Sequence, residues 1–270
     1  MKLGLLAGNR QLPLIFSQRA KAEHKDLEIV AICFKGETSP ALRRFVDRTY
    51  WIEVGRLKEV IEVLRSEGIT YCVMVGQINP QRVFEAKGWD EQMRQVVYTI
   101  DDLRPHSIFS KIIERLESEG IKFLPSTMYI EQTLASRSLM NNVAMSEGLK
   151  RTIRFGLGIM YRYRNLDIGQ TIVVKDKAVV ACEALEGTDN TILRGYRLAG
   201  EGCVVLKFSK QNQDLRFDVP VVGLTTLKFL RKIKASALVL EAKKVIIIQK
   251  DRFLNLSSRY RIPVIGVGNG

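Results

Sequence analysis

Short apolar runs alternate with amphipathic stretches along the first half of the chain. The runs "KLGLLAG", "EIVAICFKG" and "ITYCVMVGQINP" have the length of strands and end in glycine or polar residues. Between and after them, "QLPLIFSQRAKAE", "RLKEVIEVLRSEG" and "SIFSKIIERLESEG" carry apolar residues at helical spacing. Strands separated by helices predict a parallel, doubly wound sheet, here of the Rossmann-like kind.

The second half mixes hairpins with strand–helix units. "LKRTIRFGLGIMYRYRN" has helical spacing, although Gly156 and Gly158 weaken that pattern, and "TIVVKDKAVVAC" predicts a hairpin across "KDK". The small and polar stretch "EQTLASRSLMNNVAMSEG" before them is typical of a linker. We therefore predict an α/β protein of two domains, with a Rossmann-like domain over 1–135, a linker over 136–148 and a mixed α/β domain over 149–270.

Composition and charge narrow the class of protein. Hydrophobic residues make up 46% of the 270 residues, enough for a globular chain with a full core. The 42 Lys and Arg against 29 Asp and Glu give a net charge of +13. This favours an anionic partner such as a nucleotide, a phosphorylated lipid, a nucleic acid or a membrane surface.

The four cysteines and the absence of long apolar runs indicate a compartment. Cys33, Cys72, Cys182 and Cys203 lie in or beside apolar runs without C-x₂-C spacing, which favours buried free thiols in a reducing cytosol over a zinc site. No run reaches the ~18–20 apolar residues of a membrane span, and the start is too quickly polar for a signal peptide. We expect a cytoplasmic protein with peripheral contact to the inner membrane at most.

Two loops follow predicted strands of the first domain, where parallel sheets bind ligands. The first, "AGNRQLP", lacks the full G-x-G-x-x-G pattern, and Lys35 precedes Glu37 where an acidic residue would end the second strand. An anion held by backbone N–H groups at the next helix start and an ordinary strand–helix turn both remain open. Its candidate ligand-binding residues are Gly8, Asn9, Gln11, Leu12 and Pro13.

The second loop, "GQINP", offers Gly76, Gln77 and Asn79. Its amide side chains could hydrogen-bond a base or a sugar. Equally, Asn79 could cap a turn before Pro80.

The stretch "EALEGTDNTILRG" gathers carboxylates in a basic protein. Thr188 or Asp189 could be a helix N-cap, with Gly187 supplying an unusual backbone angle. Alternatively, Glu186, Thr188 and Asp189 face a cleft, where a carboxylate would coordinate Mg²⁺ and a hydroxyl would bind a phosphate or sugar.

A second acidic segment, "NQDLRFDVPVVG", is predicted to be extended, because Pro220 disfavours helix before it. Alternation would then place Asp214, Arg216 and Asp218 on one side, suited to metal or phosphate chemistry or to an exposed edge strand. Lys207, just upstream, could neutralise a phosphate or simply be solvated.

His24 and His106 are the only histidines, and no Ser–His–Asp arrangement is readable. An enzyme of this sequence would rely on carboxylates, a metal and basic side chains. Such groups favour phosphoryl transfer or phosphoanhydride hydrolysis, in which positioning and charge neutralisation dominate.

Four segments in order along the chain resemble one family. They are "LGLLAGNRQLP", "LDIGQTIVVKDKAVVACEALEGTDNTILRG", "VVLKFSKQNQDLRFDVPVVGLTTL" and "IPVIGV". The chain resembles the LpxI family, the UDP-2,3-diacylglucosamine pyrophosphatases of lipid A biosynthesis. The resemblance runs nearly end to end and is densest from Leu166 to Leu227. Family members carry an Asp-Asp pair where this chain has Pro105 and His106, so Asp101 and Asp102 could substitute for it.

The resemblance implies Mg²⁺-dependent hydrolysis at the α-phosphate to UMP and 2,3-diacylglucosamine 1-phosphate (lipid X), in a C-terminal catalytic domain. Asp218 would be the catalytic residue, and Asp189 and Asp218 would hold the metal. Together with the two loops of the first domain, the residues expected to bind the substrate are Gln170, Glu186, Gly187, Thr188, Lys207 and Asp214.

The implied partners are the UDP-linked diacyl sugar, its lipid X product and an anionic membrane surface, with no nucleic acid; a homo-oligomer remains open. Two alternatives stay in view. One is a pyrophosphatase for another nucleotide sugar. The other is a non-catalytic binder of anionic lipid or nucleic acid, suggested by the sequence pI of about 9.7.

Overall fold

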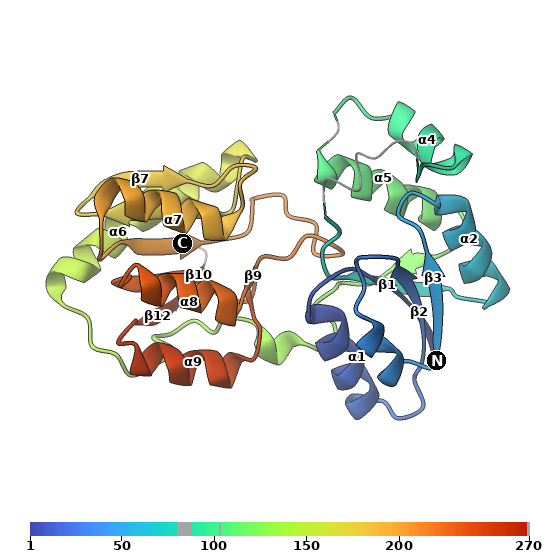
Figure 1. The fold of residues 1–270 in the computed structure, drawn as a ribbon, viewed down its shortest axis with the longest axis horizontal. Coiled ribbons are helices and arrows are strands. Elements are labelled where there is room, and N and C mark those ends of the chain that lie inside the picture. Colours follow the sequence, from blue (N-terminus) through green and yellow to red (C-terminus); the bar gives the residue numbers. More distant parts are fainter. Residues whose placement is uncertain (80–87, 103, 269–270) are drawn as a thin grey trace. The chain divides into compact units, whose positions relative to one another are not determined.

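The structure is a computed structural model in which the chain divides into two compact units (Figure 1). Unit 1 comprises Met1–Ile130 and Asp214–Asp218, and unit 2 comprises Glu131–Gln213 and Val219–Gly270. The predicted α/β class with two domains is confirmed. The residues described are 1–79, 88–102 and 104–268.

Unit 1 is built on a five-stranded sheet in the order β3-β2-β1-β4-β5, in which every neighbouring pair is parallel. The predicted doubly wound sheet is therefore present. Its strands are β1 (Lys2–Ala7), β2 (Glu28–Phe34), β3 (Arg48–Ile52), β4 (Tyr71–Val75) and β5 (Lys122–Phe123). Its α-helices are α1 (Leu12–Glu23), α2 (Leu57–Ser66), α4 (Glu91–Tyr98) and α5 (Pro105–Glu117), with a 3-10 turn η1 (Pro40–Arg44).

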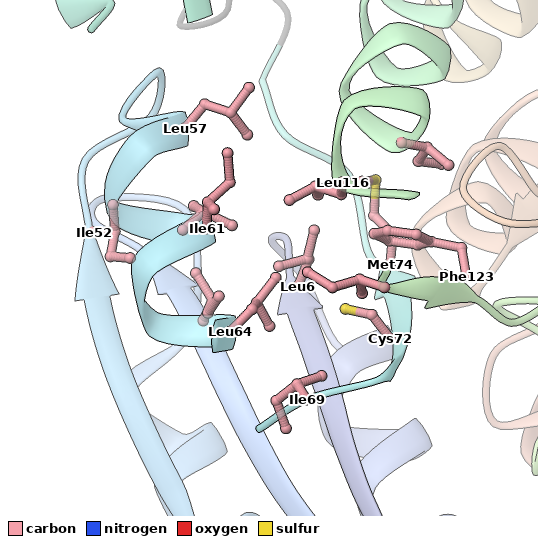
Figure 2. Close-up of a cluster of buried hydrophobic side chains, with 14 of the residues drawn as sticks. Leu6, Ile52, Leu57, Ile61, Leu64, Ile69, Cys72, Met74, Leu116 and Phe123 are labelled. Atoms are coloured by element: carbon pink, nitrogen blue, oxygen red, sulfur yellow. The ribbon is translucent and has the colours of Figure 1, made fainter. Parts of the chain in front are cut away.

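The core of unit 1 forms where α2, α4 and α5 cover one face of this sheet. Leu57, Ile61 and Leu64 of α2 follow the i, i+4, i+7 spacing of a buried helical face. All three belong to the cluster around Leu6, with Ile61 and Leu64 on the side facing it, while Leu116 of α5 lies near Met74 of β4 (Figure 2). Each fully buried aliphatic side chain of this kind stabilises the fold by about 1.5–3 kcal/mol.

Unit 2 contains a mixed sheet in the order β12-β10-β8-β6-β7. The predicted hairpin joins β6 to β7 through Asp176 and Lys177, both with positive φ. Its strands are β6 (Thr171–Lys175), β7 (Ala178–Cys182), β8 (Val204–Lys207), β10 (Ala237–Glu241) and β12 (Val264–Val267), and β9 (Val221–Val222) pairs with β11 (Ile246–Ile247) outside it. Its α-helices are α6 (Glu147–Tyr163), α7 (Thr188–Ala199), α8 (Leu224–Lys232) and α9 (Lys250–Arg259), and the 3-10 turns η3 (Glu131–Thr133) and η4 (Arg164–Leu166) also belong to it.

Helices cover both faces of the second sheet. Ile153 and Met160 of α6 pack on one face, against Ile172, Val174 and Leu206. The opposite face carries α7, α8 and α9, which pack around a separate apolar cluster (Figure 1). Because β6 runs antiparallel to both β7 and β8, the carboxyl ends of β7 and β8 share one edge with the start of β6.

Two segments differ from what their sequences predict, namely a linker over 136–148 and an extended segment at 214–218. Asn141, within the expected linker, is buried and accepts a hydrogen bond from the Val264 backbone N–H at 2.9 Å, tying this stretch to β12. The prediction of an extended segment at 214–218 is wrong. It forms a turn, in which the Asp218 N–H donates to the Asp214 carbonyl at 3.0 Å.

All four cysteines are free thiols. Cys33, Cys72 and Cys203 are buried, and Cys182 is half-buried. Burial raises the pKa of the Cys33 and Cys72 thiols to about 12. Such thiols stay protonated at neutral pH, as expected of buried cysteines with a packing role.

Candidate functional site

Polar and charged residues gather at the edge of the second sheet where β7 and β8 end and β6 begins. Thr171 opens β6 and lies in register with Lys207, the last residue of β8. Glu183 directly follows β7, and its backbone N–H donates to the Thr171 carbonyl at 2.8 Å. Thr188, the first residue of α7, completes the group.

The Thr188 hydroxyl is the centre of this group. It receives a hydrogen bond from the Lys207 ammonium at 2.5 Å, lies 3.1 Å from a Glu183 carboxylate oxygen and lies 3.2 Å from the Thr171 hydroxyl. A hydroxyl has one donor and two acceptor sites, so these three partners use its full capacity. The contacts fix the side chain at the start of α7.

Lys207 and Glu183 are only 5% and 8% exposed. Burial of an isolated charge is costly. Lys207 and Glu183 offset this cost for each other, because they carry opposite charges and bind the same hydroxyl. The second carboxylate oxygen of Glu183, Oε2, is buried and has no hydrogen-bond donor among the residues that the structure describes. That oxygen could accept a hydrogen bond from a bound ligand. Glu183 opens the segment "EALEGTDNTILRG", but the sequence pattern alone does not single it out as a site residue.

The start of α7 differs from the prediction that Thr188 or Asp189 is its N-cap. The cap is Gly187, with φ of 80°, and no side chain caps the helix. Glycine tolerates this positive φ. The Thr188 hydroxyl does not cap the helix, because it is hydrogen-bonded to Lys207 and Glu183. The uncapped N–H groups and the helix dipole give this helix start a positive potential that suits an anion.

Glu186, beside this helix start, organises the loop before α7. Burial raises its pKa, but hydrogen bonds from Arg194, the Ala184 N–H and Thr191 outweigh burial and lower it to about 2. Arg194 is 2.6 Å away and the Ala184 nitrogen 2.9 Å away. Glu186 therefore remains ionised and holds the loop. Asp189 accepts a hydrogen bond from the Thr226 hydroxyl of α8 at 3.1 Å.

Gln170, the residue before β6, belongs to a small amide network. Its side-chain nitrogen donates to the Gln213 side-chain oxygen at 3.3 Å, and the same oxygen accepts from the Lys210 N–H at 2.7 Å. The Gln213 side-chain nitrogen is buried and has no partner in the described parts of the chain. This network lies at the exit of β8, next to Lys207.

In unit 1, the two predicted loops meet. The Gly8 N–H donates to the Val75 carbonyl at 2.8 Å, and Asn9 pairs with Gln77 as an isolated bridge. A Cβ on Gly8 would lie 2.6 Å from the Gln77 carbonyl oxygen, so only glycine permits this approach. The loops follow β1 and β4, where the strand order of the sheet reverses, which is the usual ligand crevice of doubly wound sheets.

Some of the residues predicted to bind a ligand in these loops are buried. Leu12 and Pro13 are buried in the first turn of α1, where they pack against the unit, while Gln11 occupies the N-cap position and is exposed. Pro80 of the second loop lies outside the described residues.

Glu37 lies beside these two loops, although the sequence did not predict it as a site residue. One of its carboxylate oxygens accepts hydrogen bonds from the Asn9 side chain at 2.7 Å and from the Asn79 N–H at 3.0 Å. It thereby connects the loops after β1, β2 and β4. The available signal was its position as the first acidic residue after β2, which an intervening Lys35 obscured.

The 214–218 turn is anchored within unit 1. Both oxygens of Asp214 accept hydrogen bonds from the Arg216 guanidinium, at 3.0 and 2.7 Å, and Arg216 also contacts Glu117 at 2.9 Å. Burial raises the pKa of Asp214, but Arg216 outweighs burial and lowers it. Phe217 lies beside His106, with ring centroids 5.3 Å apart. The Arg216 guanidinium thus binds the Asp214 carboxylate in this structure. A role of Asp214 in substrate binding stays a prediction.

Asp102, expected as a substitute for the family's Asp-Asp pair, lies just before α5, whose N-cap is Arg104 without a side-chain cap. It accepts hydrogen bonds from the Arg104 N–H and the Ser107 hydroxyl, both at 2.8 Å. Arg104 and these contacts lower its pKa strongly. The carboxylate is therefore engaged in local structure.

The predicted metal ligands belong to different units, with Asp189 in unit 2 and Asp218 in unit 1. Across 1–79, 88–102 and 104–268, no three His, Cys, Asp or Glu side chains form a group that could hold a metal ion. Mg²⁺ commonly takes one or two protein carboxylates and completes its shell with phosphate and water oxygens. That Asp189 and Asp218 share a Mg²⁺ stays a prediction.

No helix in the described part of the chain is both long and apolar enough to cross a membrane.

Two domains of one known protein family match the chain in succession. The profile of the LpxI N-terminal domain matches residues 2–133, and that of the LpxI C-terminal domain matches residues 136–265. A relative from Caulobacter vibrioides, named UDP-2,3-diacylglucosamine pyrophosphatase LpxI, is 23% identical; the match covers 98% of this chain and 97% of the relative.

Likeness to solved structures is weak. The biotin carboxylase domain of the Hydrogenobacter thermophilus 2-oxoglutarate carboxylase matches with 13% identity and a TM-score of 0.28, over 73% of this chain and 41% of that one. Glycinamide-RNase-transformylase T from Mycobacterium tuberculosis matches with 14% identity and a TM-score of 0.24, over 68% of this chain and 44% of that one.

Proposed function

This chain belongs to the LpxI family of pyrophosphatases of lipid A synthesis, and we propose that it hydrolyses UDP-2,3-diacylglucosamine to UMP and 2,3-diacylglucosamine 1-phosphate. The observation that carries the proposal is the match of both family domains, in order, over nearly the whole chain. A relative named for this activity matches over the same extent.

The edge of the second sheet supports a role in binding the pyrophosphate. The buried Lys207 ammonium and the uncapped start of α7 both supply positive potential beside Thr188. Phosphoryl transfer depends mainly on positioning and on neutralising the charge of the phosphates. A rigid set of cation, hydroxyl and helix start suits that task, because it costs no reorganisation when the phosphate binds.

Asp218 is the carboxylate that we assign to catalysis, as the acceptor of the proton of the attacking water. Its neighbour Asp214 is neutralised by the Arg216 guanidinium, which makes Asp214 a poor proton acceptor. Within the 214–218 turn, the assignment therefore falls on Asp218. The water oxygen attacks the α-phosphorus, the phosphoanhydride bond breaks, and the sugar 1-phosphate leaves.

With Mg²⁺ bound, Asp189 and one oxygen of Asp218 would hold the metal, since carboxylate oxygens are ligands that it accepts, and the other Asp218 oxygen would accept the proton. When bound, the metal would neutralise negative charge on the phosphoryl oxygens.

Hydrolysis in ¹⁸O-labelled water tests both the reaction and the position of attack. We expect UMP and 2,3-diacylglucosamine 1-phosphate as products, with the label in UMP. Label in the sugar phosphate would contradict attack at the α-phosphorus. Turnover of unacylated UDP-sugars without turnover of the diacyl substrate would assign the chain to another nucleotide sugar, and no turnover of any UDP-sugar would overturn the proposal.

A further inference from the structure

Three arginines lie along the outer face of α6. Its inner face packs Ile153 and Met160 on the second sheet, which leaves Arg151, Arg154 and Arg162 exposed. These three positions follow one another at intervals of three and eight residues, so they share one side of the helix. Within the described residues, none of the three guanidinium groups has a carboxylate at ion-pair distance. Lys150 of the same helix pairs with Glu147, and Arg154 also helps to lower the pKa of Glu147.

Apolar side chains are exposed where this helix ends. Leu166 closes η4 directly after α6 and is 62% exposed, and Ile168 in the following loop is 50% exposed. Leu185, in the loop after β7, is 97% exposed. The two loops touch, because a Cβ on Gly169 would lie only 2.1 Å from the Glu183 carbonyl oxygen. Single exposed leucines are common, but here three large aliphatic side chains lie exposed on two loops that touch.

We propose that these six residues form a docking surface for an anionic lipid bilayer. The three arginines would contact lipid phosphates, which guanidinium groups bind through paired hydrogen bonds. Leu166, Ile168 and Leu185 would enter the boundary between headgroups and acyl chains, as the apolar side of interfacial helices does. The surface lies wholly within unit 2, and the proposal holds whether or not the chain is a pyrophosphatase.

The composition of the surface favours a bilayer over a nucleic acid. Both partners would engage the arginines through phosphates. Single-stranded nucleic acids are bound through aromatic stacking platforms as well, and none of the six residues is aromatic. Exposed aliphatic side chains gain nothing from a sugar-phosphate backbone, whereas burial in a bilayer removes them from water.

Co-flotation with vesicles tests the proposal. Vesicles of phosphatidylcholine alone are compared with vesicles that also contain phosphatidylglycerol. The wild-type chain should float with the anionic vesicles and stay behind with the neutral ones. The variant R151Q/R154Q/R162Q should bind about a hundredfold more weakly, since each cation near an anionic surface contributes about fivefold to partitioning.

The matched control is R197Q/R252Q/R259Q, which removes the same charge from exposed positions on α7 and α9, on the opposite face of the sheet. It should keep wild-type binding. The variant L166S/I168S/L185S should also lose vesicle binding while hydrolysing detergent-dispersed substrate at the wild-type rate. Circular dichroism and thermal unfolding establish that each variant is folded.

Four results would overturn the proposal. The first is no binding of the wild type to anionic vesicles. The second is an equal loss in both arginine variants, which would show that total charge and not this face decides. The third is a serine variant that binds vesicles normally while the R151Q/R154Q/R162Q variant loses RNA binding, which would assign the three arginines to nucleic-acid binding. The fourth is a serine variant whose turnover of dispersed substrate falls, which would assign the aliphatics to substrate binding.

Discussion

The Lys207 ammonium donates a hydrogen bond to the Thr188 hydroxyl across 2.5 Å, which joins the end of β8 to the first residue of α7. Both the cation and the Glu183 carboxylate on the other side of this hydroxyl are buried. One hydroxyl thus mediates between two opposite charges at the edge of the second sheet.

Removal of this hydroxyl should affect both stability and catalysis. Thr188→Val keeps the shape but leaves Lys207 and Glu183 without their shared partner, so unfolding should require about 1–3 kcal/mol less. Loss of the fixed position of Lys207 should lower kcat about 10- to 100-fold. Urea denaturation and initial rates measure the two effects.

Thr188→Ser is the matched control, because it keeps the hydroxyl and lacks only a methyl group. It should stay within about 1 kcal/mol of the wild type and retain most of its activity. Equal stability and equal kcat of the valine and serine variants would show that the hydroxyl has neither role.

Glu37 should act as a positioning residue in unit 1. Glu37→Ala removes the acceptor shared by Asn9 and Asn79 and should lower the free energy of unfolding by about 1–2 kcal/mol. If the loops after β1 and β4 bind the substrate, KM should rise with a smaller change in kcat, whereas Glu37→Gln, which retains an acceptor oxygen, should show a milder effect. An unchanged KM in the alanine variant would confine Glu37 to a structural role.

Two glycines of α6 should respond in opposite ways to alanine. A Cβ on Gly156 would meet a Leu206 methyl group at 2.8 Å and a Val174 methyl group at 3.2 Å, so Gly156→Ala should destabilise the chain by about 1–3 kcal/mol. Gly158 lies in the same helix with nothing within 4 Å, so Gly158→Ala should stabilise it by about 0.5–1 kcal/mol. Thermal unfolding measures both, and shifts of the same sign would contradict the packing of α6.

Glu67 should make unit 1 sensitive to acid. Hydrogen bonds from Tyr50, Arg48 and Lys2 outweigh burial and lower its pKa to about 2, from an ordinary value of 4.5. A carboxyl group with a lowered pKa in the folded state stabilises above its unfolded pKa, and this stabilisation is lost as the pH falls toward the folded pKa. The free energy of unfolding should therefore decline between about pH 4.5 and pH 2.

Glu67→Gln should be less stable than the wild type at neutral pH and should decline less steeply below pH 4.5, so that the two curves approach each other near pH 2. Glu62→Gln, at an exposed carboxylate 3.8 Å from Lys58, is the control and should follow the wild-type curve. Parallel curves for the wild type and Glu67→Gln would exclude Glu67 as the source.

The sequence predicts the elements well because their signals are local. Apolar runs of strand length and the helical spacing of Leu57, Ile61 and Leu64 depend on neighbouring residues alone. The meeting of the Gly8 and Gly76 loops was also foreseeable, because both follow strands of one parallel sheet.

Other features depend on contacts between distant residues. Glu37 reaches Asn79 across 42 positions, which no local pattern encodes. Alternation predicted an extended segment at 214–218, but the Asp214 side chain accepts the Arg216 N–H and thereby stabilises a turn. Thr188 has the composition of an N-cap, yet the buried Lys207 and Glu183 recruit its hydroxyl and leave the cap to Gly187.

The rate of UMP release from UDP-2,3-diacylglucosamine, measured for the wild type and for Asp218→Asn with Mg²⁺ present, tests the central claim most directly. Asparagine keeps the size of the side chain but cannot accept a proton from water. We predict steady UMP release by the wild type and a fall of at least about 100-fold in a variant that unfolds at the wild-type temperature. Equal rates for the two proteins would contradict the assignment of Asp218, and absence of UMP release by the wild type would contradict the proposed reaction itself.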